Sequence, residues 1–137
     1  MKEKFISLYF DVAERVSQLS HAQRLKVGAV VVKDDRILSY GYNGTPAGFD
    51  NCCEIEGTTR PEVVHAEMNT IAKIAKHGDS CEGATMFITH APCIECAKMI
   101  LQSGIVKVYY KTDYRSMVGV NLLNNVIEVI KHESSNW

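Results

Sequence analysis

The sequence predicts an α/β fold: a three-layer αβα sandwich around a five-stranded mixed sheet. Segments with helix-type and strand-type patterns alternate along the chain, and an unbroken apolar run at residues 27–32 has the length of a strand. With 137 residues and 46% hydrophobic content, the chain has enough apolar material for one core. We therefore expect one domain over residues 1–137.

The first predicted element is a packing helix over residues 2–19. Its apolar residues recur at spacings of three and four, which places on one helical face Phe5, Leu8, Tyr9, Val12, Val16 and Leu19. The apolar run at residues 27–32 then predicts a strand that is buried on both faces. Residues 37–42 predict a second strand, and the short connection between the two makes them an antiparallel hairpin.

Three later segments complete the predicted sheet, at residues 84–89, 106–110 and 126–130. A short helix is expected at residues 119–123, and strand, helix and strand in this order favour a parallel pair joined by a right-handed crossover. Residues 51–64 have weak periodicity and predict no regular structure. The last residues, 133–137, are expected to form a frayed tail.

Two more predicted helices begin at residues with metal-binding chemistry. One starts at the motif His65-Ala66-Glu67 and ends at Gly78, and the other opens at Pro92 and ends at Gly104. Cys93 and Cys96 lie three apart at the second helix start, where free N–H groups favour the thiolate form that binds metal.

These motifs offer three metal ligands and one spare carboxylate. A zinc ion with three protein ligands keeps a fourth position for water, as in catalytic sites, whereas structural sites are usually closed by four. Glu67 is then placed to carry protons rather than to bind the metal. Alone, Cys93 and Cys96 would also fit a redox pair or two buried thiols, but together with His65 and Glu67 they favour a catalytic zinc site.

Charge and composition limit the class of partner. The chain has 15 Lys and Arg against 16 Asp and Glu, so its net charge of −1 gives no basic field for long nucleic acid and favours a small substrate. No apolar run approaches the roughly 18 residues of a membrane span. The number of cysteines, five, is odd, and two of them lie in the C-x-x-C motif, which argues against a disulfide framework. We expect Cys52 and Cys53 to be free rather than ligands of a second metal. A soluble, cytoplasmic protein is expected.

The motif pattern H-x-E…P-C-x-x-C resembles that of zinc nucleobase deaminases in the cytidine deaminase superfamily. Within that superfamily, the loop Gly-Tyr-Asn-Gly-Thr-Pro-Ala-Gly at residues 41–48 looks like that of deoxycytidylate (dCMP) deaminases. Residues 26–29, 96–98, 104–105 and 113–114 match that family as well. The resemblance implies a cytidine deaminase-like fold and a zinc-dependent deaminase domain that hydrolyses dCMP to dUMP and ammonia and so feeds thymidylate synthesis. From composition alone, a surface turn is the favoured interpretation of this loop, and a substrate loop is the alternative.

The resemblance also implies roles for individual residues. His65, Cys93 and Cys96 would hold Zn²⁺, and Glu67 would shuttle protons between water and the cytosine ring. The remaining implied contacts are with the substrate: Asn43 on the sugar, the Ala66 backbone on the base, a stacked Tyr114 on the ring, and Arg24 and Lys26 on the phosphate. For Arg24 and Lys26, solvated surface charge remains an equally open interpretation.

Members of this family resemble one another in being oligomers, typically hexamers, that dCTP with Mg²⁺ activates and dTTP inhibits. The resemblance implies that Tyr42, Asn43 and Gly44 contact the effector, with Lys76 holding the loop in its active form. Two alternatives stay open. One is another deaminase of the superfamily, acting on free nucleosides or single-stranded nucleic acid, and the other is a non-enzymatic zinc module with a fourth protein ligand.

Overall fold

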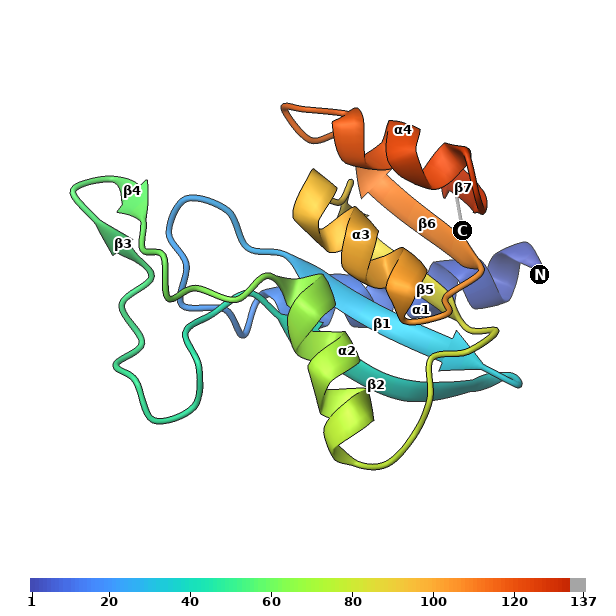
Figure 1. The fold of residues 1–137 in the computed structure, drawn as a ribbon, viewed down its shortest axis with the longest axis horizontal. Helices are drawn as coiled ribbons and strands as arrows, with labels where there is room; N and C mark the ends of the chain where they lie inside the picture. The colour runs from blue at the N-terminus through green and yellow to red at the C-terminus, as the bar shows by residue number, and fades with distance from the viewer. Residues whose placement is uncertain (134–137) are drawn as a thin grey trace.

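A five-stranded mixed sheet forms the centre of the computed structural model, which describes residues 1–133 (Figure 1). The strands, in the spatial order β2-β1-β5-β6-β7, are β1 (Gly28–Lys33), β2 (Arg36–Tyr42), β5 (Thr85–His90), β6 (Lys107–Thr112) and β7 (Glu128–Lys131). β1 pairs antiparallel with both β2 and β5, whereas β5, β6 and β7 run parallel. The predicted mixed sheet, with its antiparallel hairpin and parallel last strands, is confirmed.

The β1–β2 hairpin turns at Asp34 and Asp35, whose φ angles are 53° and 61°. A two-residue turn with positive φ at both positions matches the twist of the flanking strands, and aspartate tolerates this conformation. Every residue of β1 from Gly28 to Val32 is buried, as the unbroken apolar run predicts. This burial requires cover on both faces of the sheet.

Helices provide that cover and give the predicted three layers (Figure 1). The helices are α1 (Glu3–Ser17), α2 (Ala66–Lys76), α3 (Ile94–Gln102) and α4 (Val118–Asn124). On one face, Phe10 of α1 packs against the sheet and meets the ring of Phe87 edge-on. On the other face, Ile74, Ile100 and Leu123 bring α2, α3 and α4 into a second apolar cluster against the strands.

The buried face of α1 differs in part from the predicted one. Phe5, Leu8 and Leu19 are 42%, 48% and 46% exposed, so their predicted place in the core is wrong. The residues that α1 buries are Ile6, Tyr9, Phe10, Ala13 and Val16. Apolar residues recur at spacings of three and four on two overlapping faces of this helix, one through Phe5 and one through Phe10. The face that contains Phe10 is the one that packs against the sheet.

A short ribbon interrupts the segment for which no regular structure was predicted. β3 (Glu54–Ile55) and β4 (Thr58–Thr59) pair antiparallel and project away from the sheet (Figure 1). Arg60 fixes the base of this ribbon: its guanidinium lies 2.7 Å from a carboxylate oxygen of Asp50 and 3.0 Å from one of Glu62. With two residues per strand, the ribbon is too short to give a strand pattern in the sequence.

The helix starts lie where the sequence predicts them, with one small shift. α2 begins directly after His65, and α3 begins after Cys93, so Pro92 precedes the helix cap instead of opening the helix. Most of the predicted tail, residues 134–137, lies outside the described residues. Within residues 1–133, no helix is long and apolar enough to cross a membrane.

Candidate zinc site and substrate pocket

His65 and Cys93 are the N-cap residues of two neighbouring helices. Both have extended backbones, with φ and ψ of −68° and 154° at His65 and −72° and 171° at Cys93, and neither side chain caps its own helix. Cys96 lies one turn into α3 and is fully buried. The two helix starts therefore direct one imidazole and two thiols toward a common point.

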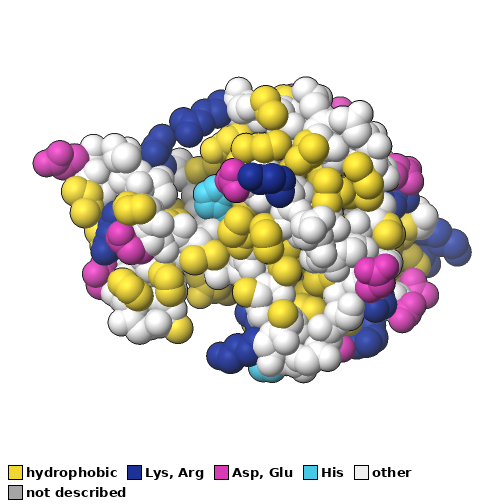
Figure 2. Space-filling view, viewed as in Figure 1, with side chains coloured by type: hydrophobic (Ala, Val, Ile, Leu, Met, Phe, Trp, Pro, Cys, Tyr) yellow, Lys and Arg dark blue, Asp and Glu magenta, His cyan; other side chains and the backbone are white. Residues whose placement is uncertain are grey.

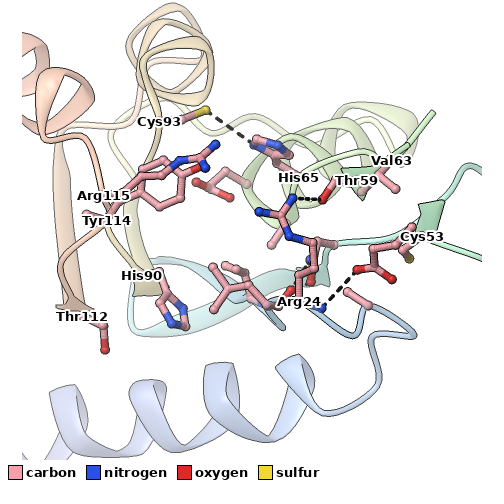
Figure 3. Close-up of a pocket in the computed structure, with 18 of the residues that line it drawn as sticks. Arg24, Cys53, Thr59, Val63, His65, His90, Cys93, Thr112, Tyr114 and Arg115 are labelled. Carbon is pink, nitrogen blue, oxygen red and sulfur yellow. Dashed lines mark hydrogen bonds between the residues drawn. The ribbon is translucent and has the colours of Figure 1, made fainter. Parts of the chain in front are cut away.

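The three ligand atoms are spaced as a tetrahedral metal site requires. His65 Nδ1 lies 3.3 Å from Cys96 Sγ and 3.5 Å from Cys93 Sγ, and all three atoms are within 4.8 Å of one another (Figure 3). Zinc bonds of about 2.1 Å to nitrogen and 2.3 Å to sulfur separate tetrahedral ligands by about 3.6 Å. In the described part of the chain, no fourth His, Cys, Asp or Glu joins this cluster. The donor set fits zinc with one position left open.

The protonation of this cluster already favours metal binding at one thiol. Hydrogen bonds with Cys96 and His65 lower the pKa of Cys93 to about 3, so Cys93 is a thiolate at neutral pH. The hydrogen bond with Cys93, together with burial, raises the pKa of Cys96, and the hydrogen bond with Cys93 also raises the pKa of His65. At Cys96 and His65, protons therefore compete with a metal ion for the ligand atoms.

Glu67 lies on the first turn of α2, two positions after His65. Its side chain is buried, with 4% of the residue exposed, and burial raises the pKa of its carboxyl to about 7. A cation bound at the neighbouring cluster would favour the carboxylate by its charge. Glu67 can therefore take up and release a proton near neutral pH, which is what a general acid and base must do.

A cavity of about 660 Å³ opens in front of this cluster. Figure 2 shows it as a hollow between the projecting ribbon segment and the main body of the molecule. Its walls include most of the predicted site residues, namely Arg24, Asn43, His65, Ala66, Glu67, Cys93 and Tyr114. The volume lies in the usual range for small-molecule sites.

Asn43 lines the pocket, and its side chain also forms hydrogen bonds with the backbone of the segment that leads into β1. Its Oδ1 accepts a hydrogen bond from the Val27 N–H (2.9 Å), and its Nδ2 donates to the Leu25 carbonyl (2.8 Å). A side-chain amide has two N–H groups and two oxygen lone pairs, so one of each remains for a ligand. The loop is thus part of the pocket wall and not merely a surface turn.

The β3–β4 ribbon holds Arg24 at the pocket wall. The backbone N–H groups of Gln23 and Arg24 both donate to Glu54 Oε2, at 3.0 and 3.2 Å, and the Arg24 guanidinium donates to Thr59 Oγ1 at 3.2 Å (Figure 3). Glu54 and Thr59 come from the two strands of the ribbon. The ribbon therefore fixes both the backbone and the side chain of Arg24.

Apart from the fully buried ligand Cys96, four predicted residues are not among those that line the pocket. Lys26 is exposed and is not among the lining residues. Tyr42 and Gly44 flank Asn43 in the chain but do not line the pocket. The Tyr42 carbonyl accepts a hydrogen bond from the side-chain amide of Asn69 (2.9 Å), and Gly44 forms a β-bridge with Val64. The fourth is the last residue of α2, Lys76, about 15 Å along the helix axis from Ala66. The effector roles of the last three stay predictions.

His90, at the end of β5, lines the pocket without having been singled out in the sequence. Thr89 Oγ1 accepts the Gly28 N–H (3.2 Å) and lies 2.8 Å from His90 Nδ1. This contact holds the imidazole ring of His90 in place at the pocket wall. Burial also lowers the pKa of His90, which favours the neutral ring.

Glu54, Thr59 and Arg115 are among the other lining residues that the sequence did not single out. Arg115 directly follows Tyr114, and that position was the available signal for it. Glu54 and Thr59 carried no such signal, because they reach the pocket only through the ribbon. None of the five cysteines forms a disulfide, and Cys52 and Cys53 are not part of the metal-binding cluster. That they do not bind a second metal stays a prediction.

Comparisons with known proteins agree with this geometry. Residues 2–112 match the family described as the cytidine and deoxycytidylate deaminase zinc-binding region. ComE operon protein 2 of Bacillus subtilis is 43% identical over 102 residues, which cover 71% of this chain and 53% of that protein. Deoxycytidylate deaminase of Enterobacteria phage T2 is 37% identical over 176 aligned positions, which cover 96% of this chain and 94% of that protein.

A solved structure extends the likeness to the whole fold. The dCMP deaminase of the cyanophage S-TIM5, crystallised in complex with dCMP and dUMP, is 48% identical, with a TM-score of 0.94. The match covers 96% of this chain and 99% of the cyanophage chain. The family match spans the His65 cluster and Glu67 as well as the helices α2 and α3 that carry them. On these grounds, the chain belongs to the cytidine and deoxycytidylate deaminase family.

Proposed function

We propose that this chain catalyses the zinc-dependent hydrolysis of dCMP to dUMP and ammonia, and so supplies dUMP for thymidylate synthesis. The observation that carries the proposal is the buried Glu67 beside the cluster of His65, Cys93 and Cys96 in one pocket. The choice of dCMP is supported by the phage T2 relative, named deoxycytidylate deaminase, and by the cyanophage enzyme, which was crystallised with dCMP and dUMP.

In the proposed reaction, a residue of this chain transfers protons from a bound water molecule to the cytosine ring and to its amino group. Zinc held by His65, Cys93 and Cys96 would acidify that water and hold it for attack on C4 of cytosine. Glu67 would take a proton from the water and give it to N3 as the oxygen adds to C4. The same carboxyl would then take the second proton from the hydroxyl group now on C4 and give it to the leaving amino group, as the C4 carbonyl forms and the bond from C4 to N4 breaks. The sum is dCMP plus water giving dUMP plus ammonia.

The pocket supports a set of substrate contacts. Asn43 keeps one free N–H group and one free lone pair for the sugar, and the helix start at Ala66 offers its backbone to the base. The half-buried Tyr114 offers an aromatic face for stacking on the ring. Arg24 lies on the wall as a ligand for a phosphate.

The test is release of ammonia by zinc-loaded protein from dCMP, deoxycytidine, cytidine and a single-stranded oligonucleotide that contains cytosine. We expect dCMP to be the preferred substrate by kcat/KM. Preference for a nucleoside would agree with the proposed zinc chemistry but would contradict the proposed contacts with the phosphate. Preference for the oligonucleotide would favour a nucleic-acid deaminase, whose basic and aromatic groove the charge of −1 does not suggest.

We further propose that dCTP with Mg²⁺ activates the enzyme and that dTTP inhibits it. The loop gives this regulation a physical link: Tyr42 and Gly44 lie outside the pocket, Asn43 lies inside it, and Gly44 pairs with Val64 directly before His65. An effector on the outer side of the loop would thus shift Asn43. Rates of dCMP turnover that stay flat across added dCTP and dTTP would contradict this regulation.

We also propose a homohexamer in the cytoplasm. Phe5 and Leu8 leave apolar surface uncovered on α1, which suits burial against another subunit. Five free cysteines suit a reducing compartment. Light scattering coupled to size exclusion would measure the subunit number, and a mass equal to one chain would reject the oligomer.

A further inference from the structure

Asn69, near the start of α2, contacts two segments that lead into the site. Its side-chain amide donates to the Tyr42 carbonyl at 2.9 Å and to the Val64 carbonyl at 3.4 Å. Tyr42 directly precedes Asn43, and Val64 directly precedes His65. Asn69 itself does not line the pocket. One side chain outside the pocket therefore joins the chain next to a pocket residue with the chain next to a metal ligand.

The peptide group between Tyr42 and Asn43 is held at both of its polar atoms. Its carbonyl accepts from Asn69, and its N–H donates to the Val27 carbonyl at 3.3 Å. The other hydrogen bonds of Asn43 also lead to residues 20–27: its side chain bonds to the backbone there, and its carbonyl accepts the Ser20 hydroxyl at 2.7 Å. Residues 20–27 thus form a frame around Asn43, and Asn69 connects that frame with α2.

The end of β2 lies close to α2 because residue 41 is glycine. A Cβ added at Gly41 would lie 2.5 Å from Thr70 Oγ1 and 3.1 Å from the Ala66 carbonyl oxygen. Just beyond, Gly44 and Val64 form a β-bridge with N···O distances of 3.1 and 2.8 Å. The end of β2, the loop after it and the start of α2 therefore pack as one unit.

We propose that Asn69 is a positioning residue that sets the distance between Asn43 and the start of α2, where Glu67 lies. This inference rests on the proposed function, in which Asn43 holds the sugar while Glu67 acts on the base. A substrate that spans both residues needs them at a fixed separation, and a displacement of about 1 Å can cost about 100-fold in rate. Carbonyl oxygens only accept hydrogen bonds, so a side chain with two N–H groups is suited to joining two of them.

The test compares Asn69→Asp and Asn69→Leu with the unmodified enzyme. Both replacements are close to asparagine in size, and neither leucine nor an ionised aspartate can donate to the two carbonyls. We expect KM for dCMP to rise about tenfold or more, because both carbonyls lose this donor. KM for deoxycytidine should rise by a similar factor, because the two substrates share the sugar. Zinc content should stay the same, since the three ligands are unchanged.

Ile74→Val and Asn121→Asp are the controls. Ile74 is buried on the same helix, so its truncation weakens the packing of α2 without removing a hydrogen bond. A variant that is only less stable has fewer active molecules, which lowers the apparent kcat and leaves KM unchanged. Asn121 is exposed on α4 and outside the pocket, so the same Asn-to-Asp change there should leave both constants within about twofold.

Two kinetic outcomes would overturn the proposal. If the Asn69 variants lowered kcat alone, as Ile74→Val should, Asn69 would contribute to stability and not to the position of Asn43. If KM rose in Asn69→Asp but not in Asn69→Leu, the effect would come from the added charge and not from the lost donors.

A second readout does not depend on turnover. Amide hydrogen exchange at Asn43, Gly44 and Val64 should become about tenfold faster in both Asn69 variants and change much less in Ile74→Val. Unchanged exchange at these amides would overturn the proposal even if KM rose. An unmodified enzyme that acts on neither dCMP nor deoxycytidine would reject the proposed function itself, and the exchange rates would still decide whether Asn69 holds the loop.

Discussion

His65 Nδ1 lies 3.3 Å from Cys96 Sγ, although 31 positions separate the two residues in the chain. The contact exists because α2 and α3 begin close together, and because the cap residues His65 and Cys93 turn away from their own helices. Free N–H groups at the start of α3 also favour thiolates there. Metal binding therefore depends on the relative position of two helix starts, and a change at either one should alter zinc affinity.

Replacing Glu67 by Gln should separate metal binding from catalysis. Glu67 is buried beside the cluster but is not one of its three ligands, so the variant should keep its zinc. Without a group that can move protons, kcat should fall about 10²- to 10⁴-fold. Zinc content by mass spectrometry and ammonia release from dCMP would measure the two effects.

Glu95→Gln is the control for that variant. Glu95 is an exposed residue in the first turn of α3, pairs with Lys98 at 2.9 Å and does not line the substrate pocket. We expect its kcat to stay within about twofold. If Glu67→Gln retained full activity, a non-enzymatic zinc module would become the better interpretation of this chain.

Zinc affinity should fall as the pH is lowered. The pKa values of Cys96 and His65 are both raised in the metal-free site, so protons compete with zinc for these two groups more strongly as the pH falls. Cys93, with a pKa of about 3, is already a thiolate and adds no dependence near neutral pH. Each displaced proton should raise the apparent dissociation constant about tenfold per unit fall in pH.

Competition with a coloured chelator between pH 6 and 8 would measure this dependence. Cys52→Ser should leave the curve unchanged, because Cys52 is exposed and lies outside the cluster. A dissociation constant that is independent of pH would mean that both groups are already deprotonated before the metal arrives.

Glu54 should act on phosphate recognition through Arg24. Because the Glu54 carboxylate accepts the N–H groups of Gln23 and Arg24, Glu54→Gln should loosen the backbone that carries Arg24. Charged hydrogen bonds are about twice as strong as neutral ones, so kcat/KM for dCMP should fall about 3- to 10-fold. Turnover of deoxycytidine should change little.

Glu56→Gln tests whether that effect is specific. Glu56 is exposed and lies in the turn of the same ribbon, two positions from Glu54. Its removal takes the same charge from the ribbon without touching the backbone of Arg24, so kcat/KM should stay near that of the unmodified enzyme. Equal losses in the two variants would show that the charge of the ribbon matters and not the hydrogen bonds.

The metal-binding cluster could be predicted from the sequence because local spacing fixes it. His65 and Cys93 each mark a helix start, and the three-residue step to Cys96 places both thiols on one side of a helical turn. β1 could be predicted for a similar reason, since an unbroken apolar run requires cover on both faces. Neither inference needs knowledge of distant contacts.

Other features depend on contacts between distant segments. On α1, the stripes through Phe5 and through Phe10 have the same periodicity, and only the sheet decides which one is buried. Glu54 reaches Gln23 across 31 positions by way of a ribbon with two-residue strands. Arg115 belongs to the pocket because its loop folds back over the site. No periodic pattern in the sequence records such contacts.

Gly119 should support the zinc site from α4. A Cβ added at Gly119 would overlap the Pro92 carbonyl oxygen and lie 2.7 Å from the carbonyl carbon of Cys93. Both contacts are with backbone at the start of α3, which cannot rotate away as a side chain can. Gly119→Ala should therefore displace Cys93, raise the dissociation constant for zinc about tenfold or more, and lower the free energy of unfolding by about 1–3 kcal/mol.

Val118→Ala is the matched control, because Val118 is the neighbouring residue of α4 and is 57% exposed. It should change the free energy of unfolding by less than about 0.5 kcal/mol and leave zinc binding as it is. Chelator competition and urea unfolding of the metal-free protein would measure the two quantities separately. If Gly119→Ala lost stability but bound zinc normally, α3 and α4 would move apart without disturbing Cys93, and the close packing at Gly119 would serve the core alone.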